Sequence, residues 1–296
     1  MSRAVRPAWM EKPKPLTSLA KGLALVVVCL LVMVPFLVVV ATSLASPEEV
    51  VANGGWVLWP RHPTFAAYHD IFRGGQVTHA LAVSLGVTAA GTALSLACTT
   101  LLAYALSRPQ LVGGRKIMLA ILFTFLFPPG MIPAFLLVKQ LGLLDSYAAV
   151  IAPVLINVYN LVIVRGFIQG LPDELFEAAR LDGAGEWQVL RRIVVPLSRS
   201  VLAVIGLFYA VSYWNAWFHA SIYLSDQKWP IQQLLRTYII QGAQLADPSA
   251  GDATAVSSPQ TVRMAVLMVA VLPIILVYPF VQRFFVKGVL SGAIKS

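Results

Sequence analysis

Six long apolar runs limit what this chain of 296 residues can fold into. They lie near residues 22-44, 80-106, 117-137, 148-168, 201-222 and 261-284. Each run, as a helix, is long enough to cross a hydrocarbon layer about 30 Å thick. Hydrophobic residues make up 58% of the chain and charged residues 12%, a balance too apolar for a soluble globule. The sequence therefore predicts an all-α polytopic membrane protein with six transmembrane helices.

Lysine and arginine are distributed unevenly among the connecting loops. If the N-terminus is cytoplasmic, 16 of the 22 basic residues fall on the cytoplasmic side and 6 on the other. Because basic residues collect in cytoplasmic loops, this asymmetry predicts that both termini are cytoplasmic. We expect cytoplasmic tails at 1-21 and 285-296 around a membrane domain at 22-284. The net charge of +9 then reflects topology and contact with membrane lipid, and gives no reason to expect a nucleic-acid partner.

A charged segment at 171-197 separates the fourth apolar run from the fifth. Pro172 suits a first helical position, and Asp173 and Glu174 place negative charge at the positive end of a helix dipole, so a helix is predicted to begin here. Gly183 is expected to end that helix before a second, basic element. In the predicted topology this loop is cytoplasmic. Its narrow apolar face suits insertion into the groove of a soluble partner.

The same loop carries a spaced set of residues: Glu177, Ala178, Ala179, Gly183, Ile193 and Pro196. Three residues separate the alanine pair from the glycine, and nine more precede the isoleucine. This spacing resembles the EAA signature of bacterial ABC importer permeases, EAA-x3-G-x9-I-x-L-P, and departs from it only at Val195. The resemblance implies a type I ABC importer permease fold. It also implies that 171-197 is the coupling loop, which docks on a separate ATP-hydrolysing subunit.

Two absences in the sequence agree with that resemblance. The chain has no G-x-x-x-x-G-K-[ST] phosphate loop, so no cofactor is expected in it, and ATP with Mg would bind the partner subunits. The apolar runs lack central Asp, Glu, Lys or Arg, which ion-coupled carriers usually keep. An ion-coupled secondary transporter or a structural membrane subunit remains the alternative. A membrane enzyme ranks third, because no paired carboxylates, nucleophile motif or metal-ligand cluster occurs.

The outer half of the fifth run is rich in aromatic residues and is where we expect contacts with a substrate. The candidates are Tyr209, Tyr213, Trp214 and Asn215. Aromatic faces stack on sugar rings, and tyrosine and asparagine tips hydrogen-bond to hydroxyl groups. For Trp217 and Tyr223, nearer the predicted membrane surface, an interfacial aromatic belt explains the pattern equally well.

Beyond the loop, the chain resembles the maltose-type second permease of carbohydrate importers, and within it the branch named for LplC. Residues 203-211, 213-215 and 278-289 carry this resemblance, together with an outer-loop pattern at Trp59, Pro60, Thr64 and Tyr68. It implies import of oligosaccharides, often acidic ones derived from alginate or pectin, across the bacterial inner membrane. The implied partners are a second homologous permease, two ATP-binding cassette subunits and an extracytoplasmic solute-binding protein.

Helix-breaking residues occur within three of the runs. The third contains Pro128, Pro129 and Gly130, the fourth contains Pro153, and the sixth contains two further prolines. Because proline leaves a backbone carbonyl without its helical partner, these positions predict kinks in membrane helices.

Overall fold

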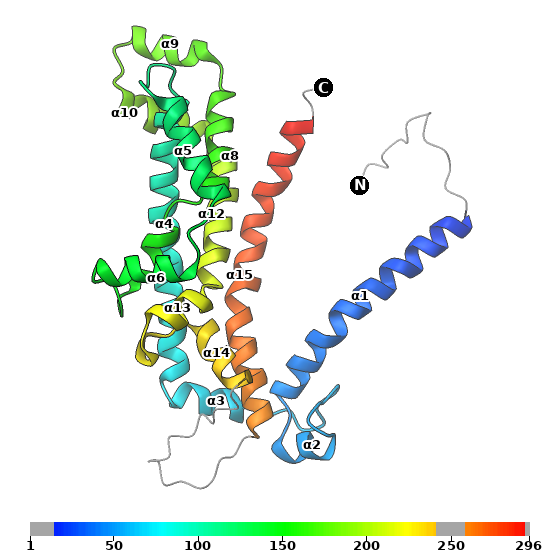
Figure 1. Ribbon diagram of the computed structural model, residues 1–296. Helices are drawn as coiled ribbons and strands as arrows, with labels where there is room; N and C mark the ends of the chain where they lie inside the picture. Colours follow the sequence, from blue (N-terminus) through cyan, green and yellow to red (C-terminus); the bar gives the residue numbers. More distant parts are fainter. Residues whose placement is uncertain (1–14, 241–257, 294–296) are drawn as a thin grey trace. The chain divides into compact units, whose positions relative to one another are not determined.

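The computed structural model describes residues 15–240 and 258–293, with side chains to residue 279 in the second range. Within these ranges all regular secondary structure is helical and no strand occurs (Figure 1). This confirms the all-α prediction. Residues 1–14, 241–257 and 294–296 lie outside the described part, and with them most of the predicted N-terminal tail and the end of the C-terminal tail.

The helices follow the apolar pattern of the sequence. Their bounds are α1 (Pro15–Ser43), α2 (Pro47–Ala52), α3 (Ala66–Arg73), α4 (Gln76–Ser107), α5 (Gly114–Leu126), α6 (Met131–Gln140), α7 (Tyr147–Ile151), η1 (Ala152–Val154), α8 (Val158–Gln169), α9 (Asp173–Leu181), α10 (Glu186–Val189), the π-helix η2 (Leu190–Val194), α11 (Val195–Leu197), α12 (Arg199–Trp214), α13 (Trp217–Tyr223), η3 (Asp226–Lys228), α14 (Ile231–Ile240) and α15 (Pro259–Ala293).

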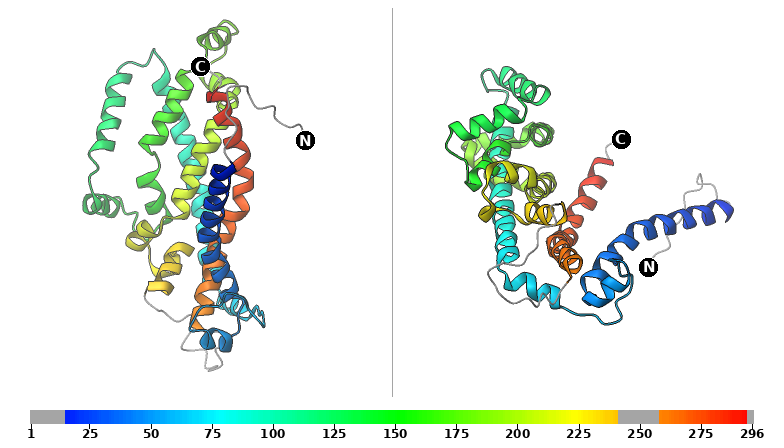
Figure 2. Two further views of the ribbon diagram at one scale, coloured as in Figure 1. Left: turned by 90° about the vertical axis from the view of Figure 1, so that its right-hand side faces the viewer. Right: turned by 60° about the horizontal axis from the view of Figure 1, so that its bottom comes forward.

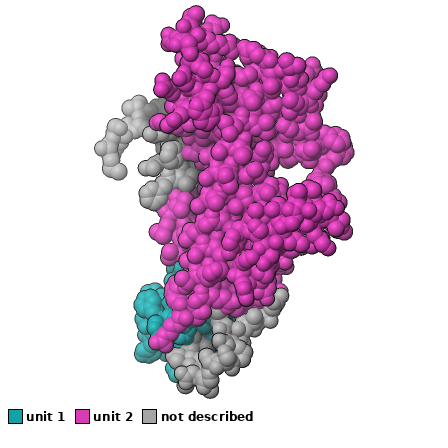
Figure 3. Space-filling view, turned by 90° about the vertical axis from the view of Figure 1, so that its left-hand side faces the viewer, with its two compact units in different colours: residues 1–70, 251–268 teal, residues 71–250, 269–296 magenta. Residues whose placement is uncertain are grey.

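The chain divides into two compact units, residues 1–70 with 251–268 and residues 71–250 with 269–296 (Figure 3). In the first unit, Thr42 Oγ1 accepts a hydrogen bond from the Val57 N–H at 3.0 Å, which ties the end of α1 to the following loop. Ser43 Oγ and the Tyr68 hydroxyl share a hydrogen bond at 2.8 Å. The outer-loop residue Tyr68 is therefore a packing contact within this unit.

The second unit is built on α4, α8 and α12, which lie side by side (Figures 1 and 2). Two hydrogen bonds join buried side chains of α4 and α12: Ser95 to Tyr213 and Thr99 to Tyr209, each at 2.7 Å. Where no water can satisfy a polar group, such bonds hold membrane helices together. Gly91 allows the close approach, because a Cβ built there would lie 2.8 Å from the Tyr213 ring.

Several apolar runs are broken. The third run forms α5 and α6, which are bent by 117° around Gly130, whose φ is 83°. The fourth run bends by 51° before α8, where Asn157 Oδ1 caps the new helix by accepting the Asn160 N–H at 3.1 Å. The kinks predicted in these two runs are confirmed. In the sixth run, Pro273 and Pro279 lie inside the helix α15, and the kink predicted there stays a prediction.

The structure places limits on the number of spans. Three described helical segments are long and apolar enough to cross a membrane alone: Pro15–Ser43, Gln76–Ser107 and Pro259–Pro279. Three bent helix pairs, Gly114–Leu126 with Met131–Gln140, Tyr147–Val154 with Val158–Gln169, and Glu186–Leu197 with Arg199–Trp214, bring the number to six if each pair forms one span. The count of six spans and the cytoplasmic placement of both termini stay predictions.

Candidate functional site

Segment 171-197, for which we keep the name coupling loop from the predicted role, begins with the helix that the sequence predicts. α9 starts directly after Pro172, with Asp173 and Glu174 in its first turn. It ends at a left-handed glycine: Gly183 has a φ of 72°, and its N–H donates to the Arg180 carbonyl at 3.0 Å. The Ala184 N–H donates to the Ala179 carbonyl at 2.9 Å, which completes a Schellman turn. No atom lies within 4 Å of a Cβ built at Gly183, so this position requires glycine for its backbone conformation and not for space.

The second element of the loop is one helical segment in which a π-helical turn separates two short α-helical parts. α10 leads into the π-helix η2, which is followed by α11. Ile193 and Pro196 are half-buried, whereas Val194 between them is fully buried. π-turns are rare and are frequent at functional positions. The signature residues of this element therefore face the protein more than the solvent.

The inner side of α9 packs on the end of α4. Phe176 and Ala179 are both buried. The guanidinium of Arg108, which follows α4, lies 4.1 Å from the centre of the Phe176 ring and 4.4 Å from the centre of the Tyr104 ring. A cation over an aromatic face is attracted by the ring quadrupole, most strongly where water is excluded.

A carboxylate from α10 completes this cluster. Glu186 Oε2 lies 3.4 Å from Arg108 Nη2 and accepts a hydrogen bond from the Tyr104 hydroxyl. Arg108 Nη2 also donates to the Tyr104 hydroxyl, at 2.5 Å. We call Tyr104, Arg108, Phe176 and Glu186 the loop anchor. It joins both elements of the coupling loop to α4.

The outer side of α9 is exposed in the described part of the chain. Glu177 and Ala178 of the signature are exposed, and so are the apolar residues Leu175 and Leu181. Leu181 has 90% of its surface accessible. The apolar face predicted for this helix is therefore divided: Ala179 packs inward, and Leu175, Ala178 and Leu181 point outward. An exposed apolar tip on an anchored helix suits docking on a soluble protein.

The four predicted substrate-path residues occupy different surroundings. Tyr209, Tyr213 and Trp214 are buried, and both tyrosine hydroxyls make the contacts with α4 described above. The Trp214 Nε1 is buried and has no hydrogen-bond partner among the described residues. Asn215 is exposed at the end of α12, where its Nδ2 donates to the Val211 carbonyl at 2.8 Å. The structure brings the two tyrosines together and leaves Asn215 apart, and their role in a substrate path stays a prediction.

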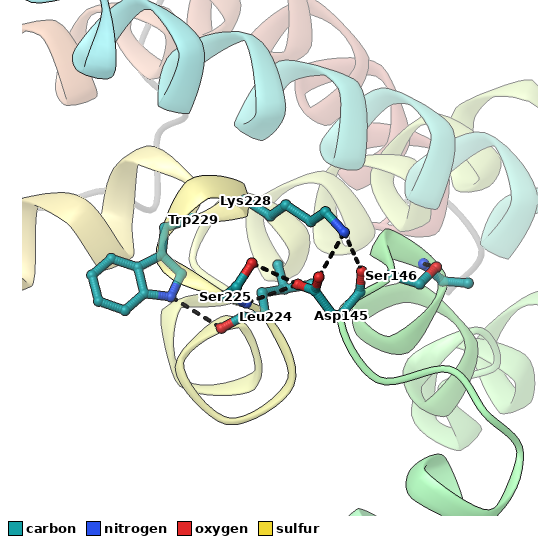
Figure 4. A network of polar contacts seen from close by, with 7 residues as sticks. Asp145, Ser146, Leu224, Ser225, Lys228 and Trp229 are labelled. Carbon is teal, nitrogen blue, oxygen red and sulfur yellow. Dashed lines mark hydrogen bonds and ion pairs between the residues drawn. The ribbon is translucent and has the colours of Figure 1, made fainter.

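A second polar cluster joins the turn after α6 to the turn after α13 (Figure 4). Asp145 Oδ1 accepts hydrogen bonds from the Ser225 N–H at 2.9 Å and the Ser225 hydroxyl at 2.8 Å, and Asp145 Oδ2 lies 2.8 Å from Lys228 Nζ. The ammonium of Lys228 and the two Ser225 donors lower the pKa of the Asp145 carboxyl to about 2. Asp145 itself has a φ of 56°, the only positive value of a residue other than glycine in the described part. We call this group the outer clip.

Sequence reasoning missed both the loop anchor and the outer clip. In the sequence, Arg108 is one of many basic residues that indicate the orientation of the chain in the membrane. No nearby residue suggests that it pairs with Glu186, which lies 78 positions away. Ser95 and Thr99 also carry no signal, because isolated hydroxyls within an apolar run are common. The one available hint at the anchor was Phe176, a large apolar residue next to the signature.

Comparisons with known proteins show which proteins the chain is similar to. Residues 112–291 match the family model described as "Binding-protein-dependent transport system inner membrane component". The polygalacturonan/rhamnogalacturonan transport system permease protein YtcP of Bacillus subtilis (strain 168) is 44% identical over 274 residues, which are 92% of this chain and 96% of that protein. Protein LplC of the same organism is 41% identical over 263 residues, which are 88% and 89% of the two chains.

A solved structure shows the same fold. It is the crystal structure of a bacterial ABC transporter involved in the import of the acidic polysaccharide alginate, with a TM-score of 0.87 and 30% identity, covering 94% of this chain and 100% of the other. ATP hydrolysis in such importers is carried by separate subunits, so this chain is not an enzyme. The chain belongs to the family of binding-protein-dependent transport system inner membrane components, and it is a multi-pass inner-membrane permease of a carbohydrate ABC importer.

Proposed function

We propose that this chain forms half of a translocation pathway for an oligosaccharide. A second homologous permease forms the other half, an extracytoplasmic solute-binding protein delivers the sugar, and two ATP-binding cassette subunits bind ATP and Mg. The chain itself needs no cofactor. The names of its relatives support a carbohydrate substrate, since they include transport of polygalacturonan and rhamnogalacturonan and import of alginate. Membership of this family favours the importer over an ion-coupled carrier.

Coupling to ATP hydrolysis runs through α9 in this proposal. The observation that supports it is the combination of an exposed apolar tip, Leu175 and Leu181, with a base held by the loop anchor. A docking element must transmit force in both directions, and a helix that could swing freely on its base would transmit little. Transport requires the importer to alternate between an inward-facing and an outward-facing state, and ATP can drive this only if it binds the two states with different affinity. In this proposal the ATPase subunits close when ATP binds, and their contact with α9 passes that closure to the permease.

Replacing Leu181 with glutamate is expected to separate the ATPase from the permease. The side chain is almost fully exposed, so the substitution changes little in the folded chain but places a charge in an apolar interface, at a cost of about 2–4 kcal/mol in binding. Co-purification of the ATPase subunit with the variant measures this. The matched control is Val112→Glu, because Val112 is 95% exposed and lies outside the coupling loop. Equal retention of the ATPase by both variants would contradict docking at α9.

The charge of the substrate follows from the same proposal and has its own test. The relatives named for polygalacturonan and alginate transport act on polymers of uronic acids, so we propose an acidic oligosaccharide. The reconstituted complex with its binding protein should hydrolyse ATP faster with oligouronates than with neutral oligosaccharides of equal length. If only neutral oligosaccharides stimulate ATP hydrolysis, the chain is still part of an importer, but the proposal of an acidic substrate is contradicted.

Asn215 is the path residue that remains accessible in this structure, and it provides the test of the predicted pathway. Asn215→Leu would leave a sugar hydroxyl without a partner, a loss of about 1–3 kcal/mol where the contact is buried. The rate of uptake should fall by about fivefold or more, with ATPase co-purification unchanged. Asn215→Gln keeps the amide and should retain most of the rate. Wild-type uptake by the leucine variant would assign the substrate contacts to the second permease.

A further inference from the structure

A groove of about 340 Å³ opens between α4, the second element of the coupling loop and the start of α12. Its floor is apolar and includes Ala97, Leu101, Leu190 and Leu202. The one hydroxyl in the floor, that of Thr100, is already bonded to the Leu96 carbonyl of its own helix at 2.6 Å. The groove therefore offers no hydrogen bonds to a polar ligand along its floor.

The rim of this groove differs from its floor. Trp187 and Arg191 both line it, and both are exposed, Trp187 with 64% of its surface accessible. Arg191 takes part in neither of the ion pairs found among the described residues. Among the residues that the structure describes, no aspartate or glutamate lines the groove. An unpaired cation above an apolar slot is complementary to an amphiphile with an anionic head.

We propose that this groove binds an anionic phospholipid, with an acyl chain against α4 and the phosphate on Arg191. In the predicted topology the lining residues of α4 lie toward its cytoplasmic end, which is the leaflet that carries anionic lipid. Tryptophan and arginine at this depth are typical of membrane interfaces, where the ring and the guanidinium reach the head groups. The inference rests on the predicted orientation of the chain and adds a ligand to the proposed coupling loop.

A lipid in this groove would contact the coupling loop and could therefore affect ATP hydrolysis. The residues that line the groove include Leu190 and Arg191 of the π-helix η2 and Val195 of α11. A bound acyl chain would fill the space between these turns and α4, and so support the second element of the loop on the side opposite the solvent. Hydrolysis of ATP stimulated by the binding protein should therefore rise when anionic lipid is present.

The test compares two neighbouring arginines in the complete importer. Wild-type complex and two variants, Arg191→Gln and Arg192→Gln, are reconstituted in nanodiscs of phosphatidylethanolamine with or without phosphatidylglycerol. Arg191 lines the groove, whereas Arg192 is exposed outside it. Native mass spectrometry counts the phosphatidylglycerol molecules that each complex retains. The measurement uses neither sugar nor nucleotide, so it is valid even if the proposed transport function is wrong. Loss of one cationic contact should reduce retention about fivefold in Arg191→Gln only.

A third variant retains Arg191 but fills the apolar part of the groove with a larger side chain. Ala97 is exposed in the groove, so Ala97→Trp should be tolerated by the fold and should exclude the acyl chain. It is expected to lose the bound phosphatidylglycerol and the lipid stimulation of ATP hydrolysis together. Equal retention by all variants, an equal loss for the two arginines, or cross-linking of residue 97 to the second permease would each overturn the lipid site.

Discussion

Replacing Gly91 with valine is expected to separate α4 from α12 and to abolish uptake. A Cβ at this position would lie 2.8 Å from the Tyr213 ring, a separation that real structures do not show. The ring has little room to move, because its hydroxyl is bonded to Ser95 at 2.7 Å. Overpacking of this kind costs about 1–3 kcal/mol. The yield of folded protein and the midpoint of thermal unfolding in detergent measure the effect.

Gly86 provides the matched control for Gly91. It lies on the same helix, is exposed, and has nothing within 4 Å of its Cβ position. Gly86→Val therefore makes the same change in helix propensity without the collision. Combining Gly91→Val with Tyr213→Leu removes the ring and should restore part of the lost stability. If the two glycine variants unfold at the same temperature, the close approach of these helices is not what limits stability.

Arg108→Met is expected to release the coupling loop and to lower uptake by tenfold or more. The variant retains an unbranched apolar side chain about as long as the aliphatic stem of arginine, but loses the cation over two aromatic rings and the ion pair with Glu186. Its ATPase subunit should dissociate during purification. Arg115→Met is the control, since Arg115 is an exposed basic residue in the first turn of α5 that makes no ion pair in the described part.

A double-mutant cycle separates the contacts made by Arg108. Phe176→Leu removes the ring but keeps an apolar side chain, so the cycle between this variant and Arg108→Met reports the cation–ring contact. A coupling energy of about 0.5–2 kcal/mol is expected from thermal unfolding. Strict additivity would mean that the arginine acts through Glu186 and Tyr104 alone.

The features that the sequence predicted best are those set by local chemistry. The start of α9 depends on Pro172 and two adjacent acidic residues, and its end depends on one glycine, so each signal lies within a turn of its effect. The break between α5 and α6 likewise follows from neighbouring prolines and Gly130. Such signals can be interpreted without knowing the tertiary structure.

Features that join distant parts of the chain could not be predicted in this way. The hydroxyls of Tyr209 and Tyr213 are hydrogen-bonded to those of Thr99 and Ser95, more than a hundred positions away, and no local pattern indicated this pairing. The anchor of the coupling loop is non-local for the same reason. A side chain suited to a ligand is equally suited to a neighbouring helix, and only the packing decides between the two.

The outer clip bears on how the second unit could rearrange. Four hydrogen bonds converge on Asp145 from Ser225 and Lys228, so we expect the turn after α6 and the turn after α13 to move together. A conformational change that moves these turns must then be accommodated by bending of the backbone on either side of the outer clip. Gly130, with open space around its Cβ position, lies before α6, and the Asn215 helix end lies before α13. A movement of α12 would then pass through the outer clip to α6, with the backbone bending near Gly130 and Asn215. The two turns that the clip joins would keep their shape.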